Sequence, residues 1–282
     1  MVKRILASCY IYLILLLMYL PILVLIVFSF TTSSNVGEWT GFSFELYPML
    51  FQDAEIMTAL GNTIVIALIS AAVSTLLGTI GAIGTFYSKK RTRQAIEVVT
   101  QIPVVNAEIV MALSLTVMFV FLGSYIFRAT LFSFWTLLIG HVLLSLPFVY
   151  LSVKPRLQQM DPSLYEAALD LGATPTKALW KVVVPEILPG ILSGLLLSIT
   201  LSLDDFIITA FLRGPGLFSG YKSIDTLSTL VQAKIKKGPI PPELRSLTTI
   251  IFLVVLTFVI ISSIFKNRKI KSKDRKGREK NA

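Results

Sequence analysis

The sequence predicts an all-α integral membrane protein with six transmembrane helices and one polar helical segment between the fourth and the fifth. Its 282 residues are 54% hydrophobic and 15% charged, with a mean hydropathy of +0.77, which is too apolar for a soluble domain. Four runs without a charged residue each reach the roughly 20 residues that cross a bilayer core: Ile5–Gly37, Ile56–Ser88, Ala129–Val153 and Ser246–Phe265. Two equally long segments, Val98–Phe127 and Ile187–Leu212, contain acids. Backbone groups in lipid must satisfy one another, so helices are the expected spanning form.

The distribution of basic residues predicts how the chain is oriented. If the N-terminus is cytoplasmic, 19 of the 26 Lys and Arg lie on the inner side, nine of them in the segment 266–282. The positive-inside rule therefore predicts a multi-pass membrane protein with both termini in the cytoplasm. The predicted organisation is one transmembrane domain over residues 1–265 and a basic cytoplasmic tail over 266–282. Such a tail beside a membrane helix favours contact with lipid over binding of nucleic acid.

The first predicted helix covers Ile5–Phe30, and an acidic outer loop follows it. This loop, Thr31–Glu55, carries four acids and no Lys or Arg, and it contains Trp39. The acid excess would attract a cationic solute. Aromatic residues such as Trp39 also occur as anchors at membrane boundaries, which is the alternative interpretation of that ring.

The next three helices contribute one acid within the membrane. Helix 2 is predicted over Thr58–Tyr87, and helix 3 starts near Ala95. Glu108 is about 13 residues into helix 3, or roughly 20 Å, which places it near the middle of the bilayer. Helix 4, Phe134–Val153, contains His141, the one histidine of the chain. We interpret His141 as a hydrogen-bonded packing residue and not a ligand, since a single His and a single Cys do not make a Cys/His metal site.

The fifth helix, expected after Pro185 and Pro189 and ending near Leu212, contains two adjacent acids, Asp204 and Asp205. Ionisable residues within the membrane are functional candidates, because each is costly to insert. Ser198, Ser202, Asp205 and Thr209 recur at helical spacing, and Asp204 lies about 100° away on a continuous helix. Asp205 is therefore expected to face a pathway, with Asp204 at its edge or structural. The alternative is a carboxylate that caps a broken helix or pairs with Arg213.

The polar segment between helices 4 and 5, within the loop 156–185, predicts a helix–turn–helix. Asp161 precedes Pro162 as a helix cap, Gly172 suits a left-handed stop, and Thr174–Pro175 starts a second short helix. This segment also resembles the EAA motif of ABC-importer permeases: Glu166-Ala167-Ala168, three residues, Gly172, nine residues, then a Val-x-Val-Pro that ends at Pro185. The resemblance implies a cytoplasmic coupling helix that docks on an ATPase subunit through Glu166, Ala167, Ala168, Asp170 and Gly172.

The whole chain resembles the C-type permease subunits of spermidine/putrescine ABC importers. The matching stretches follow one another in order: WTGF at Trp39, AEIVMALSL at Ala107, LPFVYLSV at Leu146, EAALDLGA at Glu166 and SLDDFIITAFLRGPG at Ser202. The resemblance implies a type I ABC importer permease fold and a substrate pathway for polyamines. Residues expected along that pathway are Asp205, Asp204, Glu108, Ser202 and Trp39.

The resemblance also implies partners. They are a second, related permease subunit, an ABC ATPase dimer and an extracytoplasmic polyamine-binding protein. This chain is expected to bind no cofactor and to have no enzymatic activity, because ATP and Mg would be held by the ATPase.

Three other functions were weighed. An intramembrane aspartyl protease needs two facing carboxylates from different helices, whereas Asp204 and Asp205 are adjacent. A cation channel with a ring of acids leaves the EAA segment unexplained. A permease of the same family for ferric iron, thiamine or an oxyanion remains an alternative.

Overall fold

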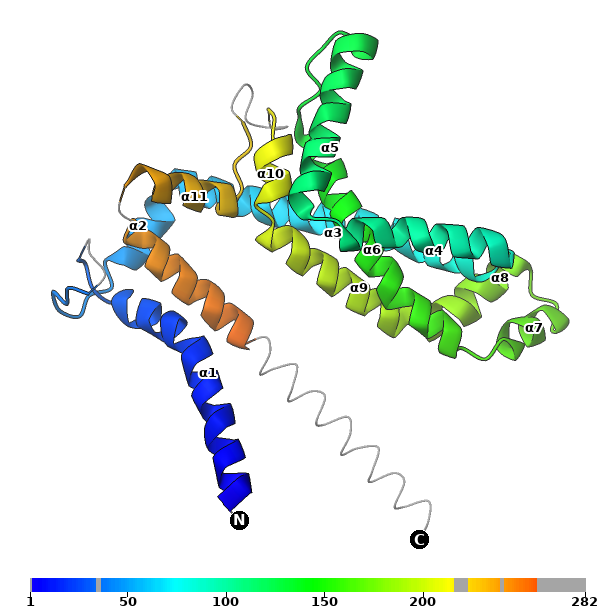
Figure 1. Ribbon diagram of the computed structural model, residues 1–282, viewed down its shortest axis with the longest axis horizontal. Coiled ribbons are helices and arrows are strands. Elements are labelled where there is room, and N and C mark those ends of the chain that lie inside the picture. Colours follow the sequence, from blue (N-terminus) through cyan, green and yellow to red (C-terminus); the bar gives the residue numbers. More distant parts are fainter. Residues whose placement is uncertain (1, 34–36, 216–222, 239–240, 258–282) are drawn as a thin grey trace. The chain divides into compact units, whose positions relative to one another are not determined.

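The structure, a computed structural model, describes residues 2–33, 37–215, 223–238 and 241–257. The described residues are helical apart from loops and one isolated bridge between Pro215 and Ser223. The helical elements are, in chain order (Figure 1), α1 Val2–Phe28, α2 Leu46–Gln52, α3 Ala54–Phe86, α4 Lys90–Val105, α5 Glu108–Phe121, the π-helix η1 Leu122–Phe127, α6 Phe134–Gln159, α7 Ser163–Asp170, α8 Pro175–Ala178, the π-helix η2 Leu179–Val183, α9 Val184–Asp204, α10 Ile207–Leu212 and α11 Leu227–Lys237. The all-α prediction is confirmed.

Five helical stretches among the described residues are long and apolar enough to cross a membrane. They are Ser8–Phe28, Ala54–Phe86, Glu108–Phe127, Phe134–Gln159 and Pro175–Asp204. Residues 243–257 are helical as well. The sixth predicted helix, Ser246–Phe265, begins within this stretch and its second half lies outside the described residues, as does the predicted tail 266–282.

Two of the predicted spans are interrupted in the structure. The third is divided into α4 and α5 by extended backbone at Asn106 and Ala107. The fifth begins earlier than expected, because helix runs without a gap from Pro175 through η2 into α9 and includes both Pro185 and Pro189. It then breaks at Asp205 before α10.

The chain divides into two compact units. The first comprises Met1–Met57 and Ala233–Ala282, and the second comprises Thr58–Gln232. In the first unit, α2 and the helix over residues 243–257 are joined by buried contacts: Ser246 Oγ donates to the Leu46 carbonyl at 3.1 Å. The guanidinium of Arg245, which is 2% exposed, donates to the Ser33 carbonyl at 2.9 Å.

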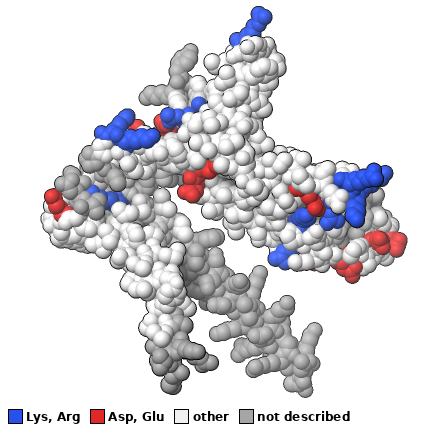
Figure 2. All heavy atoms as spheres, in the orientation of Figure 1, with Lys and Arg blue, Asp and Glu red and all other residues white. Residues whose placement is uncertain are grey.

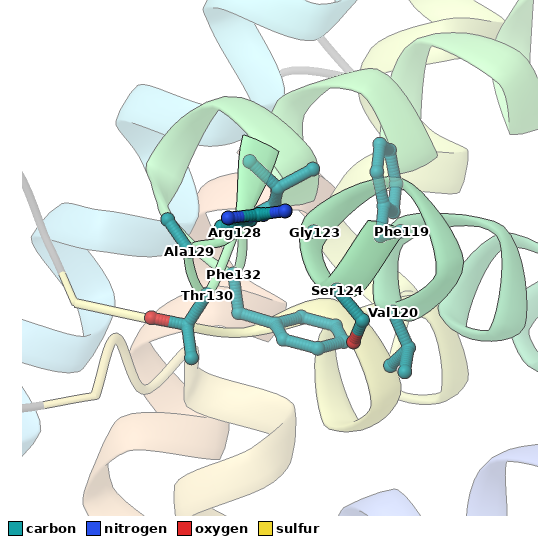
Figure 3. A pocket seen from close by; sticks show the side chains of 9 residues that line it. Phe119, Val120, Gly123, Ser124, Arg128, Ala129, Thr130 and Phe132 are labelled. Carbon is teal, nitrogen blue, oxygen red and sulfur yellow. The ribbon is translucent and has the colours of Figure 1, made fainter. Parts of the chain in front are cut away.

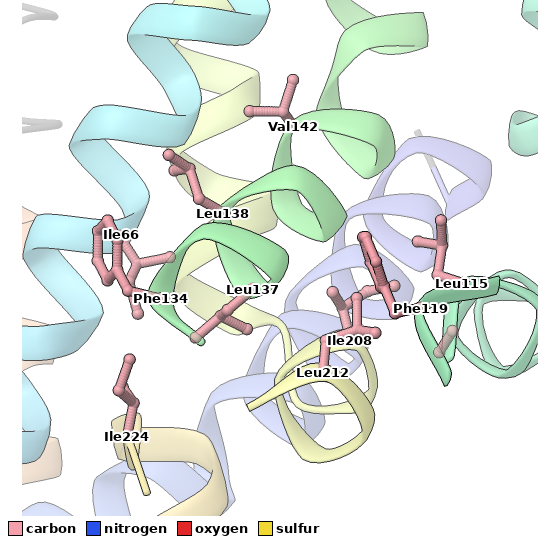
Figure 4. Close-up of a cluster of buried hydrophobic side chains, with 11 residues drawn as sticks. Ile66, Leu115, Phe119, Phe134, Leu137, Leu138, Val142, Ile208, Leu212 and Ile224 are labelled. Carbon is pink, nitrogen blue, oxygen red and sulfur yellow. The ribbon is translucent and has the colours of Figure 1, made fainter. Parts of the chain in front are cut away.

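The second unit holds the candidate site, and its core joins four helices. Apolar side chains of α3, α5, α6 and α10 meet in one buried cluster (Figure 4). Leu137, Ile208 and Leu212 are completely buried there. Because lipid is as apolar as these side chains, their close packing, and not their transfer out of water, holds the helices together.

A second contact in this unit fixes α9 against α6. A Cβ atom built on Gly190 would lie 2.7 Å from Arg156 Cγ and 2.9 Å from the backbone oxygen of Ser152. Only glycine therefore allows the two backbones to approach this closely. At this contact Val149, Val153 and Ile187 are fully buried in a second apolar cluster. The pair α6–α9 is thus closely packed along its length.

Candidate functional site

Two helix breaks in the second unit enclose an acidic cavity of about 300 Å³. Three acids line it: Glu108 from the start of α5, Asp204 from the end of α9, and Asp205 from the break that follows α9. The other lining residues are apolar or neutral: Pro103, Val104, Asn106, Met111, Leu144, Phe148, Thr200 and Leu201. Figure 2 shows the acidic atoms gathered where α9 ends. We call this cavity the acid pocket.

The first break places Glu108 at a helix start. Asn106 and Ala107 have extended backbones, with ψ of 145° and 134°, and Glu108 is the first residue of α5. The expectation of a continuous helix with Glu108 in its interior is therefore wrong. The break therefore places the Glu108 carboxyl at a helix N-terminus, beside Asp204 and Asp205 in the lining of the cavity. Its side chain is half-buried.

The second break is stabilised by Asp205. Its backbone is extended, and its carboxylate accepts hydrogen bonds from the backbone N–H groups of Ile208 at 3.0 Å and Thr209 at 2.9 Å. The hydroxyl of Thr209 donates to the same carboxylate at 2.9 Å. An interrupted helix in lipid leaves N–H groups without acceptors, and Asp205 satisfies them as a cap.

The break reverses the expected exposure of the two aspartates. The side chain of Asp205 is completely buried, whereas Asp204 is exposed at the pocket. The sequence argument assumed one uninterrupted helix, in which Asp205 continues the stripe of Ser198 and Ser202. Because α9 ends at Asp204, the helical phase does not continue to Asp205. Asp204 is therefore the aspartate that presents its carboxylate to the cavity.

His141 of α6 forms hydrogen bonds with one side chain before the break and one after it. The ring is 0% exposed, with Nδ1 2.8 Å from Ser202 Oγ and Nε2 3.0 Å from Thr209 Oγ1. The same Nε2 lies 3.4 Å from the Asp205 carboxylate. The prediction of a hydrogen-bonded packing residue is confirmed. Its partners were not predicted, and the polar stripe that includes Ser202 and Thr209 was the signal that could have identified them.

The hydroxyl network extends to α3. Ser70 donates to Ser202 at 3.1 Å, and Ser74 and Ser198 lie 2.7 Å apart. Ser202, expected along the pathway, is 3% exposed and lies in this network. The polar side chains on α9 thus join three helices beneath the acid pocket.

The segment predicted to couple to an ATPase folds as expected. α7 is followed by Gly172 at φ 84°, whose N–H donates to the Leu169 carbonyl, while the Ala173 N–H donates to Ala168. These two bonds form a Schellman motif. Thr174 caps α8, with Pro175 as its first residue. Asp161 accepts from the Ser163 N–H at 3.0 Å and so starts α7.

The coupling residues are at the surface. Glu166, Ala167, Asp170 and Gly172 are exposed, and Ala168 is half-buried. Leu171, beside them, is 89% exposed. Charged side chains of both signs gather at the end of the second unit that carries α7 and α8 (Figure 2).

Trp39 and the acidic loop belong to the first unit. Trp39 is 52% exposed and has an edge contact with Phe28, with ring centroids 6.4 Å apart. Two of the loop acids are already paired, because Lys234 Nζ lies 3.1 Å from Asp53 and 3.3 Å from Glu55. The role of Trp39 in a pathway stays a prediction.

A larger cavity of about 460 Å³ has a positively charged lining instead of an acidic one (Figure 3). It lies at the end of α5 and η1, where Phe119, Phe132 and Ser124 surround Arg128. Its lining contains one cation and no acid. The acid pocket is therefore the better match to a cationic solute.

Comparisons with known proteins identify the family. Residues 74–268 match the family described as the binding-protein-dependent transport system inner membrane component. The spermidine/putrescine transport system permease protein PotC of Escherichia coli (strain K12) is 32% identical over 254 residues, which cover 90% of this chain and 91% of that protein. The putrescine transport system permease protein PotI of the same strain is 34% identical over 235 residues, or 83% of this chain and 81% of that one.

A solved structure shows the same fold. The crystal structure of a bacterial ABC transporter involved in the import of the acidic polysaccharide alginate contains a chain that aligns with a TM-score of 0.69 at 16% identity. The alignment covers 94% of this chain and 96% of that one. Nearly the whole chain therefore has the fold of an ABC-importer permease. The chain therefore belongs to the family of binding-protein-dependent transport system inner membrane components.

Proposed function

We propose that this chain is a membrane-spanning permease subunit of an ATP-driven importer that moves polyamines, spermidine or putrescine, across the bacterial cytoplasmic membrane. The observation that carries the proposal is the acid pocket: three acids line one cavity at two helix breaks, and none of the described residues that line it is a Lys or Arg. Polyamines carry several ammonium groups, which such a pocket can bind. The similarity to polyamine permeases supports the same substrate class.

The residues of the pocket take different roles in this proposal. Asp204 and Glu108 pair with ammonium groups of the substrate, since Asp204 is exposed and Glu108 lines the opposite break. The ring of Phe148 adds a face for a cation–π contact. Asp205 and Ser202 hold the second break in position, because their side chains are buried in hydrogen bonds. Trp39 is proposed to contact the solute in the outer loop.

The transport cycle that we propose is alternating access. A loaded extracytoplasmic binding protein docks on the outer side, and closure of an ATPase dimer moves the coupling segment around Glu166 and Gly172. A second permease subunit supplies the other half of the pathway, and both termini of this chain face the cytoplasm. ATP and Mg are held by the ATPase and this chain binds neither. The closely packed α6 and α9 carry the movement to the acid pocket.

Uptake by the reconstituted complex tests the proposal. Proteoliposomes that contain this chain, its partner permease and the ATPase receive the binding protein and radiolabelled spermidine or putrescine. Asp204→Asn removes a charge and keeps the shape of the side chain. Loss of one charge-assisted hydrogen bond, about 1.5–3 kcal/mol, lowers uptake at limiting substrate by about 10- to 100-fold. ATP hydrolysis stimulated by the binding protein is expected to persist.

The control is Glu186→Gln, which removes an exposed acid from the same helix without altering the pocket. Normal uptake by this variant is expected. Normal uptake by both Asp204→Asn and Glu108→Gln would refute the pathway. Transport of ferric iron, thiamine or an oxyanion by a wild-type complex that does not accept polyamines would refute the substrate class and leave the family unchanged.

A further inference from the structure

The helices around the coupling segment differ in how firmly they are held. α6 and α9 approach closely at Gly190 and Gly194, where a Cβ atom would lie within 3.2 Å of atoms of α6. The coupling elements α7, α8 and η2 connect these two helices in the chain. Two closely packed helices that share one connection move together, so α6 and α9 form a lever with α7 at its end.

α4 is held much more loosely, although it forms a wall of the acid pocket. None of its residues is buried, and its outward residues include Val98 and Val99, both 64% exposed. Yet Pro103 and Val104, near its C-terminal end, line the pocket. A movement of the lever changes the pocket on this side only if α4 follows α6.

One ion pair joins α4 to α6. Lys154 Nζ of α6 lies 2.9 Å from Glu97 Oε1 of α4, and Arg93 Nε donates to the same oxygen at 3.0 Å. No other hydrogen bond or ion pair links α4 to another helix within the part of the chain that the structure describes. The hydrogen bond from Lys154, followed by that from Arg93, keeps the pKa of the Glu97 carboxyl below its ordinary value. Glu97 is therefore ionised at neutral pH.

We propose that the Glu97–Lys154 ion pair is the tie by which the lever of α6 and α9 moves the α4 wall of the acid pocket. Lys154 lies five residues before α6 ends at Gln159 and the chain enters the coupling segment. A displacement at α7 therefore reaches Lys154 first and α4 through it. Glu97 and Lys154 act as positioning residues, since neither lines the pocket. The inference rests on the proposed alternating access and adds the route that it takes.

If this ion pair connects α4 to the lever, breaking it should reduce uptake without reducing ATP hydrolysis. When it is broken, the ATPase still closes and hydrolyses ATP, but α4 no longer follows and the pocket does not open fully. In the reconstituted complex, Glu97→Gln and Lys154→Gln are each expected to lower uptake by about tenfold, within the usual range of coupling between sites. ATP hydrolysis stimulated by the loaded binding protein stays close to that of the wild type.

The comparison includes a matched control and a double variant. Arg91→Gln removes an exposed cation from α4 without touching the ion pair, and uptake is expected to be normal. Uptake by the double variant Glu97→Gln/Lys154→Gln is expected to be no lower than uptake by either single variant, because each single substitution already breaks the same Glu97–Lys154 ion pair. Additive losses, or normal uptake by both single variants, would overturn the proposal.

A distance measurement tests whether the Glu97–Lys154 pair makes α4 move together with α6, and it does not depend on which substrate is transported. Spin labels are attached at Val99→Cys on α4 and Gln158→Cys on α6, both exposed, in a Cys9→Ser background. In the complex the interspin distance should stay constant on ATP binding, and Glu97→Gln should make it change. A distance that changes equally with and without Glu97 would refute the tie. Failure of polyamine transport alone would affect only the proposed substrate.

Discussion

Gly172→Val tests whether the coupling segment requires its tight turn. Gly172 has φ 84° and ends α7 through two hydrogen bonds of the Schellman motif. A Cβ atom at this position would meet nothing within 4 Å. The substitution therefore introduces no clash with other residues, and its whole cost is conformational.

The magnitude follows from the backbone. An L-residue in the left-handed region costs roughly 1–2 kcal/mol, and a β-branched side chain is particularly disfavoured there. A free-energy change of this size alters an equilibrium by about 5- to 30-fold. If the docked form requires this turn, Gly172→Val should weaken coupling by that factor while α6 and α9 remain packed.

The assay measures polyamine uptake and ATP hydrolysis in the same reconstituted complex. The expected result is assembly of the complex with more ATP hydrolysed for each polyamine taken up. Gly172→Asn is the control, because Asn tolerates the left-handed region better than other residues with a side chain. The amount of ATP hydrolysed for each polyamine taken up should be higher in Gly172→Asn than in the wild type and lower than in Gly172→Val. Wild-type coupling in Gly172→Val, or equal defects in the two variants, would refute the reasoning.

Two further predictions concern the buried network and the outer ion pair. His141→Leu removes the two buried hydrogen bonds that the ring forms with Ser202 and Thr209 and should lower the free energy of unfolding by about 1–3 kcal/mol, measured by thermal unfolding in detergent. An unchanged melting temperature would contradict this role. At Asp53, burial raises the pKa, but hydrogen bonds from Ile56 and Lys234 outweigh it and lower the pKa below 3.8. The resulting stabilisation is present above that ordinary value and disappears as pH falls through the lower value of the folded protein. Lys234→Met should therefore reduce the loss of thermal stability between pH 6 and pH 3, and an identical pH profile in the two proteins would exclude this contribution.

The coupling segment could be predicted from sequence because its determinants are local. Asp161, Gly172 and Thr174 each act on backbone groups within five residues. Capping residues and a glycine stop therefore identify both short helices without knowledge of the rest of the fold. The same kind of local signal also located the long apolar spans.

The acids of the acid pocket could be predicted from the sequence, but the backbone geometry that brings them together could not. Glu108 and Asp204 were recognised as costly intramembrane acids, and the structure places them around one cavity. The break at Asn106 was not predicted, because apolar residues continue on both sides of it. The break at Asp205 was foreseen only as the alternative, a carboxylate that caps a broken helix, and the structure bears out that alternative. Which aspartate is exposed depends on the second break. His141 was expected to be a hydrogen-bonded packing residue, but its partners could not be named because they are 61 and 68 residues further along the chain.

The local bonds of Asp205 also bear on how the protein is inserted into the membrane. Its backbone partners, Ile208 and Thr209, are three and four residues away. The interrupted helix can therefore satisfy its free amides on its own when it leaves the translocon, before it contacts any other helix. The hydrogen bonds to His141, in contrast, require α6 to lie beside α9 and α10. The break therefore depends on a neighbouring helix for its side-chain contacts but not for the amides of Ile208 and Thr209.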